Sequence, residues 1–301
     1  MDTQSLRLFV LASENLNISA AGRSLGMAPA VASTRIAKLE RLLGVELLHR
    51  STRKVSLSSE GADFLPYARE IIAQEEAAMA ALGNGQTRVT GQLRFAAPST
   101  FAQIYIAPLI PKFLDQYPGI TLDLHFSDAQ FNLIAGSYDL ALRNTTLEDS
   151  SLTARKLADD TRILCASPEY LRQHGTPQSP RDLKDHRLIA FRNLEPRALT
   201  PLDGERSEFA PKQAASRMVV DDGMNQKQLT LAGAGVSINS LWLVHGEIAS
   251  GALNRVLPDY AVADQPDLWL IYPKSNVVSA KVRVFMDFLI EHIGKRPAWQ
   301  V

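Results

Sequence analysis

Apolar residues recur every three or four positions between residues 29 and 43, and hydroxyl and basic side chains fill the positions between them. This spacing predicts an amphipathic helix. The stretch before it, from Ser19 to Met27, is rich in small side chains and has Leu25 and Gly26 where the chain must turn. Small residues let two helices cross closely, and glycine accepts the backbone angles of a tight turn. The two stretches predict a helix-turn-helix, which Gly44 ends.

A short alternating segment follows the second helix. Residues 47–57 predict two short strands joined by a tight tip, with Arg50 and Arg53 on the protruding loop. An arginine there can enter a narrow minor groove or hold a phosphate with two hydrogen bonds. The segment alone also fits a surface hairpin whose arginines only keep it soluble, and both interpretations stay open at this point.

A long amphipathic helix is predicted next. Ser58 or Ser59 can cap its start, and Glu60 favours the helix through its dipole. Its apolar residues form one stripe, which we expect to pair with the same helix of a second subunit rather than to enter the chain's own core. Pro66 either kinks this helix or marks its true start. The stripe consists of Phe64, Leu65, Ala68, Ile71, Ile72, Met79 and Leu82.

Beyond residue 86 strands alternate with helices, which predicts an α/β body with parallel-type sheets. A hinge is expected over residues 87–91, and about 215 residues remain, enough for two lobes. The predicted strands cover residues 93–97, 120–126, 138–142, 162–167, 187–191, 218–221, 236–239 and 268–272. The predicted helices cover residues 104–116, 129–136, 168–174, 225–233, 242–250 and 279–293.

Charge changes this picture only locally. The chain has 32 basic and 32 acidic residues, so its net charge is +0, yet Arg23 to Lys54 holds seven basic residues against two acids. Neutrality overall argues against non-specific coating of polyanions, whereas a concentrated patch supplies attraction for phosphates. A solvated helix face is the ordinary explanation for such a patch, but the turn glycine and the small residues favour a DNA-binding head.

Catalytic and metal-binding patterns are not found in the sequence. The six histidines are scattered without metal-ligand spacing, and neither a nucleophile turn nor a phosphate-binding loop occurs. Cys165, the single cysteine, lies in an apolar strand and is expected to be a buried hydrophobe. We therefore expect no catalytic residue, no metal and no cofactor. The N-terminus lacks an apolar signal region and no membrane-spanning run follows, so a cytoplasmic protein without membrane contact is expected.

The segment from Ser19 to Glu60 resembles the head of a LysR-type transcriptional regulator. The body resembles the same family at Tyr117-Pro118, Tyr138 to Arg143, Ser167-Pro168 and Gly233 to Val236. Two departures lie in the recognition helix, where Pro29-Ala30 stands in place of the usual Gln-Pro and Thr34 in place of a common Arg. The matching head residues are Ala20-Ala21, Leu25-Gly26, Ser33, Ile36, Leu39-Glu40, Leu43-Gly44, Leu47-Leu48, Arg50 to Arg53, Leu57 and Glu60-Gly61.

The resemblance implies three parts. They are a winged helix-turn-helix DNA-binding domain over residues 1–58, a linker and dimerisation helix over 59–86, and an effector-binding domain over 87–301. That domain would be folded like a periplasmic binding protein, with lobe I over about 91–161 and 268–301 and lobe II over about 162–267. Such regulators are expected to bind an inverted repeat in double-stranded DNA as dimers or tetramers, to respond to a small-molecule effector, and to contact RNA polymerase.

DNA-binding residues are expected on the recognition helix and the wing. Ser33, Thr34 and Arg35 are the expected base readers, while Ala28 and Pro29 can offer only apolar contact, for example to a thymine methyl. The complete set is Ser19, Ala28, Pro29, Ala30, Ser33, Thr34, Arg35, Lys38, Arg50, Thr52, Arg53 and Lys54.

An effector is expected between the lobes, beyond the carboxyl ends of the strands. Ser99 and Thr100 follow the first strand and precede a helix, where they either bind an anion such as an organic acid or cap the helix. Arg143 ends another strand and either contacts the effector or pairs with a structural acid. Asn239, directly after a strand, makes either a specific contact or a turn. The complete set is Pro98, Ser99, Thr100, Phe101, Arg143, Phe191, Asp222 and Asn239.

Two alternatives remain beside a ligand-controlled regulator. An architectural DNA-binding protein would need the head but has no use for a cleft-forming body. A two-lobed solute-binding protein or enzyme would need the body, but a secretion signal and a catalytic pattern are missing from the sequence.

Overall fold

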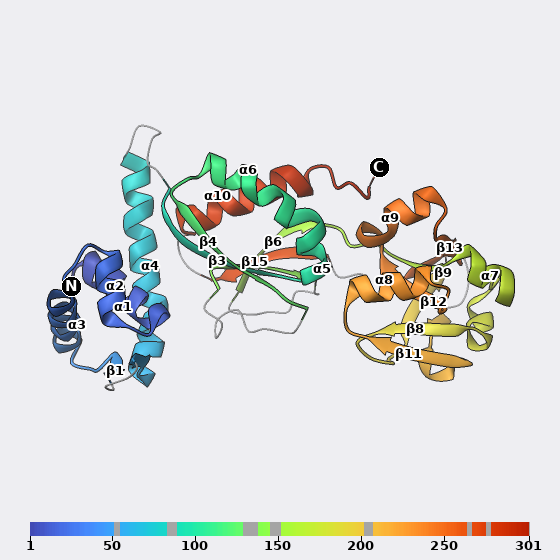
Figure 1. Cartoon of the computed structure of the whole chain (residues 1–301), viewed down its shortest axis with the longest axis horizontal. Coiled ribbons are helices and arrows are strands. Elements are labelled where there is room, and N and C mark those ends of the chain that lie inside the picture. The colour runs from blue at the N-terminus through green and yellow to red at the C-terminus, as the bar shows by residue number, and fades with distance from the viewer. Residues whose placement is uncertain are drawn as a thin grey trace. The chain divides into compact units, whose positions relative to one another are not determined.

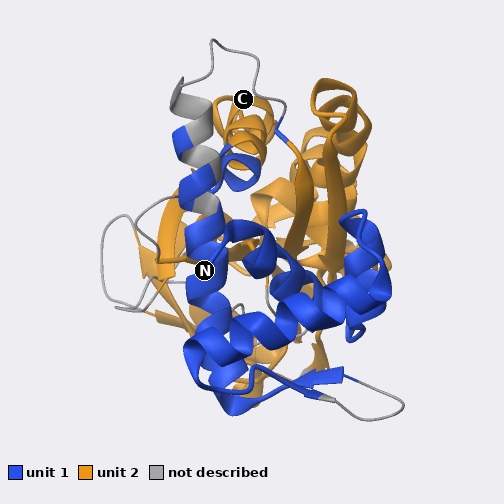
Figure 2. Cartoon of the chain, turned by 90° about the vertical axis from the view of Figure 1, so that its left-hand side faces the viewer, with its two compact units in different colours: residues 1–89, 275–283 blue, residues 90–274, 284–301 orange. Residues whose placement is uncertain are grey.

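The computed structural model describes residues 1–50, 55–82, 89–128, 138–144, 152–201, 207–263, 267–274 and 278–300. The chain divides into two compact units, and Figure 2 shows them in different colours. Unit 1 comprises residues 1–89 and 275–283, and unit 2 comprises residues 90–274 and 284–301. Each is described by itself.

Unit 1 holds a helical head with a two-stranded hairpin. A first helix, which the sequence analysis did not predict, begins after Asp2, whose carboxylate accepts a hydrogen bond from the Ser5 N–H at 2.9 Å. The helix-turn-helix and the hairpin are found where the sequence predicts them. The elements are α1 (Thr3–Asn15), α2 (Ile18–Ser24), α3 (Pro29–Leu43), β1 (Leu48–Arg50), β2 (Val55–Leu57) and α4 (Ser59–Leu82).

The helix crossing depends on the small residues between Ser19 and Met27. A Cβ atom added at Gly22 of α2 would lie 2.6 Å from the Ala32 Cβ of α3, closer than real Cβ contacts. Gly26 has φ +69° and makes the turn, and Gly44 has φ +74° and ends α3. A glycine at each turn accepts these angles without strain.

Helix α4 begins at Ser59 and continues through Pro66, so the proline lies inside the helix and does not mark its start. Ser58 acts as the cap, because its hydroxyl accepts a hydrogen bond from the Gly61 N–H at 2.8 Å. The same hydroxyl donates to the Glu46 carbonyl at 2.6 Å. The cap therefore also fixes α4 to the segment that leads into the hairpin.

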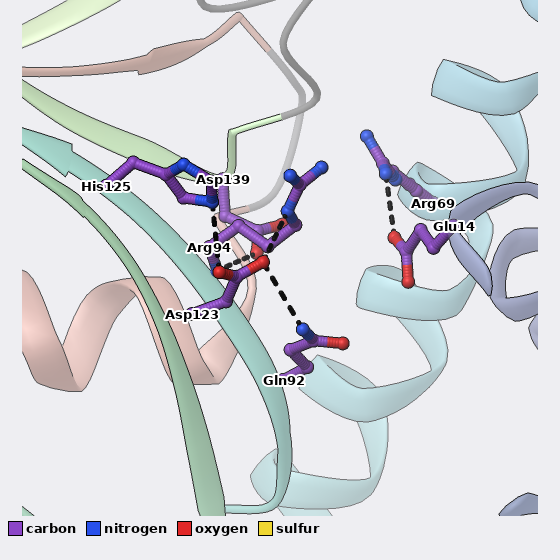
Figure 3. Close-up of polar contacts among 7 residues, drawn as sticks. All are labelled: Glu14, Arg69, Gln92, Arg94, Asp123, His125 and Asp139. Carbon is purple, nitrogen blue, oxygen red and sulfur yellow. Dashed lines mark hydrogen bonds and ion pairs between the residues drawn. The ribbon is translucent and has the colours of Figure 1, made fainter.

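The apolar stripe of α4 packs onto its own head, which corrects the expectation that it faces a second subunit. Helix α1 supplies the partner surface: the Phe64 and Phe9 ring centroids are 5.8 Å apart, and Arg69 contacts Glu14 at 2.8 Å (Figure 3). Because α1 covers this stripe, burial there stabilises the head itself. The members packed in or against the head core are Phe64, Leu65, Ala68, Ile71 and Ile72; the Met79 and Leu82 side chains lie outside those described.

The first lobe of unit 2 has a five-stranded sheet in the order β4-β3-β5-β15-β6. Figure 1 shows α6 and α10 on one face of this sheet. The Phe113 ring of α6 lies 4.8 Å from the Phe285 ring of α10, which in turn lies 5.1 Å from the Phe95 ring of β3. The strands are β3 (Gly91–Ala97), β4 (Ile120–Phe126), β5 (Leu140–Asn144), β6 (Leu152–Ala158) and β15 (Leu268–Pro273).

The helix expected over residues 104–116 starts earlier and changes its winding along its length. A short α-turn passes into a π-helix and a 3-10 turn before α6, and Pro108 and Pro111 stand where the winding changes. The helix expected over 129–136 lies outside the described residues, as do the first positions of the expected hinge. The segments are α5 (Ser99–Phe101), η1 (Ala102–Ile106), η2 (Ala107–Leu109), α6 (Ile110–Gln116), α10 (Ala280–Leu289) and η5 (Ile290–Gly294).

Polar side chains fasten the edge strand β4 to β3 (Figure 3). Arg94 and Asp123 stand opposite each other in the parallel pair and are joined at 2.9 Å, and His125 lies 3.0 Å from the other Asp123 oxygen. The Asp139 carboxylate accepts a hydrogen bond from the Arg94 N–H at 2.8 Å. These contacts hold the entrance of β5 beside β3.

The second lobe has a five-stranded sheet, β11-β8-β12-β7-β13, and a three-stranded sheet, β10-β9-β14. Helices α8 and α9 follow β11 and β12 directly. The strands are β7 (Arg162–Ala166), β8 (Arg187–Phe191), β9 (Arg197–Pro201), β10 (Ser207–Phe209), β11 (Ser216–Val220), β12 (Val236–Ser240), β13 (Asn254–Val256) and β14 (Tyr260–Val262). The helices are α7 (Pro168–His174), η3 (Pro180–Asp185), η4 (Pro211–Gln213), α8 (Gly223–Leu231) and α9 (Leu241–Ser250).

Both five-stranded sheets are mixed, which corrects the expectation of parallel-type sheets. Strand β3 pairs in parallel with β4 and β5, whereas β15 is antiparallel to β5 and β6. In the second lobe β12 is parallel to β8 but antiparallel to β7. The reason is the double crossing of the chain: β7 and β15 each enter their lobe at the end where its other strands finish, so they must run in the opposite direction.

Candidate functional site

The start of α3 is exposed in the head. Ala28, the N-cap residue, makes no side-chain capping hydrogen bond, and Pro29 and Ala30 are exposed beside it. Thr34 is exposed too, but its hydroxyl donates to the Ala30 carbonyl at 2.9 Å, which leaves its oxygen to accept. Ser19 and Ser33 are half-buried and Lys38 is exposed. These predicted DNA-binding residues therefore present apolar groups, hydroxyl groups and the ammonium group of Lys38.

Arg35, an expected base reader, contacts the beginning of α1. Its guanidinium donates to the Gln4 side-chain oxygen and lies 3.9 Å from the Asp2 carboxylate. The pKa of Asp2 is lowered, mainly by its hydrogen bond from the Ser5 hydroxyl and further by the charge of Arg35. Gln4 and Arg35 lie 31 positions apart along the chain, so the spacing of residues in the sequence could not reveal their contact.

The hairpin is fastened to α3 by Glu40. One Glu40 oxygen accepts hydrogen bonds from the Leu47 and Leu48 N–H groups at 3.0 and 3.1 Å. Strands β1 and β2 then pair antiparallel, with Leu48 opposite Leu57. Arg50 ends β1. The predicted wing residues Thr52, Arg53 and Lys54 lie outside the described residues.

A cavity of about 490 Å³ lies between the two lobes of unit 2. Strand ends supply much of its lining: Arg143 and Asn144 from β5, Phe191 from β8 and Asn239 from β12. Predicted residues that line it are Pro98, Thr100, Phe101, Arg143, Phe191 and Asn239. Lining residues that sequence reasoning missed include Asp128, Asn144, Arg162, Arg192, Glu195, Arg197, Gly223, Gln226 and Trp242.

Arginines dominate the charge of this lining. Among its described residues there are four arginines, Arg143, Arg162, Arg192 and Arg197, against the carboxylates Asp128 and Glu195. Burial lowers the pKa of Arg143, because a charged guanidinium is less well solvated there than in water. An anionic ligand would offset that loss of solvation.

Ser99 serves a different purpose from either of those expected. Its hydroxyl donates to one Asp128 oxygen at 2.6 Å, and its N–H donates to the other at 3.1 Å. Pro98 is the N-cap of α5 and makes no side-chain cap, so the helix-capping expectation for Ser99 and Thr100 is also wrong. An acid of the protein itself occupies the place predicted for an external anion at Ser99.

Two further predicted residues are corrected in their placement. Asp222 is the N-cap of α8, where its carboxylate accepts from the Asn225 N–H at 2.7 Å. Asn239 is not in a turn after a strand but within β12, opposite Ile163 of β7. Its side chain is 2% exposed. Asp222 therefore has a structural partner, while Asn239 remains a lining residue.

The first crossing between the lobes is built around Asp160, which is 1% exposed. Asp160 accepts hydrogen bonds from Asn144 at the end of β5 and from Arg162 at the start of β7, the latter at 3.2 Å. Arg162 also donates to the Asn144 oxygen at 3.3 Å. Burial raises the pKa of Asp160, although these partners act in the opposite direction. The triad positions Arg162 at the cavity.

Aromatic side chains join the lobes beside the cavity. The Trp242 ring of lobe II stands edge-on to Phe101 of lobe I, with centroids 5.1 Å apart. The Tyr105 hydroxyl donates to the Trp242 carbonyl at 2.6 Å, and Trp299 lies 4.9 Å from the Tyr105 ring. Burial raises the pKa of Tyr105 to about 12, so its hydroxyl stays a donor at neutral pH.

Three lining residues carry buried polar atoms that have no hydrogen-bond partner among the described residues. They are the Thr100 hydroxyl oxygen, the Asn239 amide oxygen and the Trp242 indole nitrogen. A buried polar group without a hydrogen bond costs about 1–3 kcal/mol. A ligand that supplied the missing partners would recover part of that cost.

Comparison with known protein families covers both units. Residues 3–62 match the family model described as bacterial regulatory helix-turn-helix protein, lysR family, and residues 86–294 match the LysR substrate binding domain. The chain belongs to the LysR family of transcriptional regulators. It is accordingly a DNA-binding transcriptional regulator whose activity is modulated by a small-molecule effector.

Individual LysR-type relatives extend over nearly the whole chain. The regulator CrgA of Neisseria meningitidis serogroup C is 34% identical over 293 residues, 97% of each sequence. DmlR of Escherichia coli K12 is 33% identical over 292 residues, which are 96% of this chain and 94% of DmlR. The solved structure of CrgA from Neisseria meningitidis gives a TM-score of 0.61 at 33% identity, covering 97% of this chain and 98% of CrgA.

The solved structures also include a virulence activator. AphB of Vibrio cholerae, a member of the LTTR protein family, gives a TM-score of 0.60 at 26% identity over 97% of this chain and its own full length.

The described residues of this LysR family member contain neither a metal-ligand cluster nor a membrane-spanning helix. In that part of the chain no group of three or more His, Cys, Asp or Glu could hold a metal ion. No helix there is long and apolar enough to cross a lipid bilayer. Cys165 is buried, and burial raises the pKa of its thiol to about 11.

Proposed function

We propose that the head reads an inverted repeat in double-stranded DNA, with the start of α3 in the major groove and the wing at the phosphates or the minor groove. The exposure of Ala28, Pro29, Ala30 and Thr34 supports this placement. Since Arg35 is held by Gln4, base contacts fall to Ser33 and Thr34, with apolar contact from Ala28 to Ala30. Lys38 and the wing residues Arg50, Thr52, Arg53 and Lys54 contact phosphates.

Sequencing of genomic fragments bound by the purified protein at near-physiological salt tests this proposal. Enrichment of a short inverted repeat upstream of a few genes is the expected outcome. Sequence-blind recovery that disappears as salt rises would instead support an architectural DNA-binding protein. Replacing Arg53 should weaken binding to most sequences and lower the salt slope, whereas replacing Ser33 should relax preference at particular base pairs.

We also propose that two copies associate through α4. Its stripe is covered by the head, so the interface uses the opposite face, where Tyr67 is 64% exposed. The bodies would add a second interface and so allow a tetramer. Tyr67→Glu should shift the dissociation of dimers to higher protein concentration in analytical ultracentrifugation, while Tyr67→Phe should not. Equal dissociation constants for both variants would contradict this use of α4.

The effector proposed for the cavity is an organic acid. The excess of arginines over carboxylates in its lining is the observation that carries this proposal. A ligand that prefers one arrangement of lobes or subunits would alter the spacing of the heads, and through it DNA bending or contact with RNA polymerase.

A thermal-shift screen of organic acids tests this assignment. A ligand at one hundred times its dissociation constant adds roughly 2.7 kcal/mol of stability. Arg143→Gln should abolish the shift, whereas Arg217→Gln, an exposed arginine on β11, should retain it. An unaltered shift with Arg143→Gln would move the site elsewhere.

Regulation rather than catalysis is the activity that we propose for the whole chain. The names of the relatives CrgA and DmlR, both transcriptional regulators, support this view. We propose that the protein needs no cofactor beyond its effector and that it acts in the cytoplasm, where its DNA target lies.

A further inference from the structure

The orientation of the Asn239 amide is determined by a chain of hydrogen bonds inside lobe II. Its amide nitrogen donates to the Ser237 hydroxyl at 2.6 Å and to the Cys165 sulfur at 3.3 Å. The Ser237 and Thr230 oxygens are 2.6 Å apart, and the Thr230 hydroxyl donates to the Gln226 carbonyl at 2.8 Å. A hydroxyl has one hydrogen to donate. Because the hydrogen of Thr230 is used for Gln226, Ser237 donates to Thr230 and is left to accept from Asn239.

Turning the amide over would break this chain. Ser237 would then have to donate to the Asn239 oxygen and to accept from Thr230, which would lose its bond to the Gln226 carbonyl. The observed orientation retains that bond and gives both amide hydrogens a partner. The Asn239 oxygen is thereby left as an acceptor with no donor in the described part of the chain, on a residue that is 2% exposed and lines the cavity.

The other two unpartnered atoms differ in chemistry from this acceptor. The Trp242 indole nitrogen can only donate a hydrogen bond, and the Thr100 hydroxyl can donate or accept. Thr100 belongs to lobe I, whereas Trp242 and Asn239 belong to lobe II. The residues that line the cavity thus carry arginine side chains and donors for an acid, together with a buried acceptor that an acid in its ionised form cannot satisfy.

We infer that the effector is a hydroxy acid, whose carboxylate binds the arginine-lined part of the cavity and whose hydroxyl donates to the Asn239 oxygen. This inference rests on the proposed binding of an organic acid in the cavity. A hydroxyl fits better than an ammonium group as the donor. The arginines of the lining outnumber its carboxylates, so the positive charge of an ammonium group would be repelled. The Asn239 oxygen selects against the acid that lacks the hydroxyl, because binding that acid leaves the oxygen buried and unpartnered.

Matched pairs of acids test the inference on the full-length wild-type protein. Isothermal titration would compare malate with succinate, lactate with propionate, and 4-hydroxybenzoate with benzoate. We expect the hydroxy acid of at least one pair to bind about 10- to 100-fold more tightly than its deoxy partner. Binding of acids without preference in every pair would overturn the hydroxyl assignment and leave the organic-acid proposal intact. Failure of every acid to bind would overturn both.

Variants of the hydrogen-bond chain then identify the residue responsible. Asn239→Ala should remove the preference, bringing the two dissociation constants of the responsive pair together. Ser237→Ala removes the group that orients the amide and should reduce the preference while the Asn239 side chain remains. Asn193→Ala is the matched control, since Asn193 also lines the cavity but its oxygen already accepts from the Glu195 N–H at 3.1 Å. A preference that survives both Asn239→Ala and Ser237→Ala would overturn the assignment to Asn239.

Discussion

Gly61 shows how a single residue determines the packing of the head. A Cβ atom at this position in the first turn of α4 would lie 2.0 Å from the Leu47 carbonyl oxygen. The atom that blocks it belongs to the backbone, so it cannot move aside as the end of a flexible side chain would. In the body, Asp160 has a comparable importance for the first crossing between the lobes, because its buried carboxylate is held between Asn144 and Arg162.

Replacement of Gly61 by alanine should destabilise the head by about 1–3 kcal/mol, because the added methyl group overpacks the contact with Leu47. Urea denaturation of the full chain, monitored with a probe that reports the unfolding of the head, measures the loss of stability. Gly246→Ala is the control: Gly246 lies in α9 with open space around it, and alanine there should stabilise by up to about 1 kcal/mol. Equal midpoints for the two variants would contradict the role of Gly61.

Asp160 predicts a dependence of stability on pH. Burial raises the pKa of its carboxyl in the folded protein, so the folded state keeps the proton to higher pH than the unfolded chain does. Its contribution to stability is complete below the ordinary value of about 3.9 and is lost as pH rises through the raised pKa. The free energy of unfolding of the wild type minus that of Asp160→Asn should therefore fall as the pH rises above the ordinary pKa of an aspartate. An increase of this difference with pH would contradict the prediction. Asp259→Asn, at an exposed site, is the control.

At the scale of elements, the wing depends on α3 for its position. The two strands are only three residues each, and two-stranded ribbons are marginal alone. Glu40 supplies the anchor, since it accepts both N–H groups at the start of β1. Contact of the wing with DNA should therefore be sensitive to a residue of α3 that faces the hairpin.

Glu40→Ala should leave the Leu47 and Leu48 N–H groups without their acceptor, lower the stability of the head by about 1–3 kcal/mol and weaken DNA binding. Footprinting at constant salt should show protection lost at the wing positions before the major-groove positions. Glu46→Ala, which removes an exposed carboxylate next to His49, should change neither. Uniform loss of the whole footprint with Glu40→Ala would show instead that the head has unfolded.

Local patterns in the sequence were sufficient to predict several helices and strands. They were insufficient to predict which residues pack against those elements. Helical spacing and Gly44 gave the bounds of α3, because a helix and its end depend on neighbouring residues. The stripe of α4 was found correctly, but its partner was not, since α1 covers it. Ser99 likewise was recognised as polar at a helix start, but the acid that occupies it, Asp128, lies 29 positions away. Contacts between distant residues leave no trace in spacing.

At the scale of the whole body, the two lobes are joined by specific contacts as well as by the segments of chain that cross between them. Tyr105 donates across to Trp242, and Arg192 donates to the Asp128 carbonyl. Neither pair was predicted from the sequence, although Phe101, which stands edge-on to Trp242, was expected at the cavity. A ligand entering between the lobes must act against these contacts or in concert with them.

Tyr105→Phe removes the hydrogen bond between the lobes and retains the ring. It should lower the stability of the body by about 0.5–1.5 kcal/mol and increase hydrogen exchange at η1 and α9, on either side of the missing bond. Tyr117→Phe is the control within lobe I, where the hydroxyl contacts the adjacent Gln116. Unchanged exchange at α9 would indicate that the edge-on aromatic contacts alone maintain the junction.

The position of β15 governs the order in which the newly made chain can fold on the ribosome. The strand lies between β5 and β6, yet it is made about a hundred residues after them. The head core, from Leu6 to Ile72, and the lobe II strands emerge first, while β5 and β6 expose unpaired edges until residue 273 follows. A product truncated before β15 would therefore carry a complete head on an unfinished lobe I, able to occupy operators while exposing edges that invite aggregation.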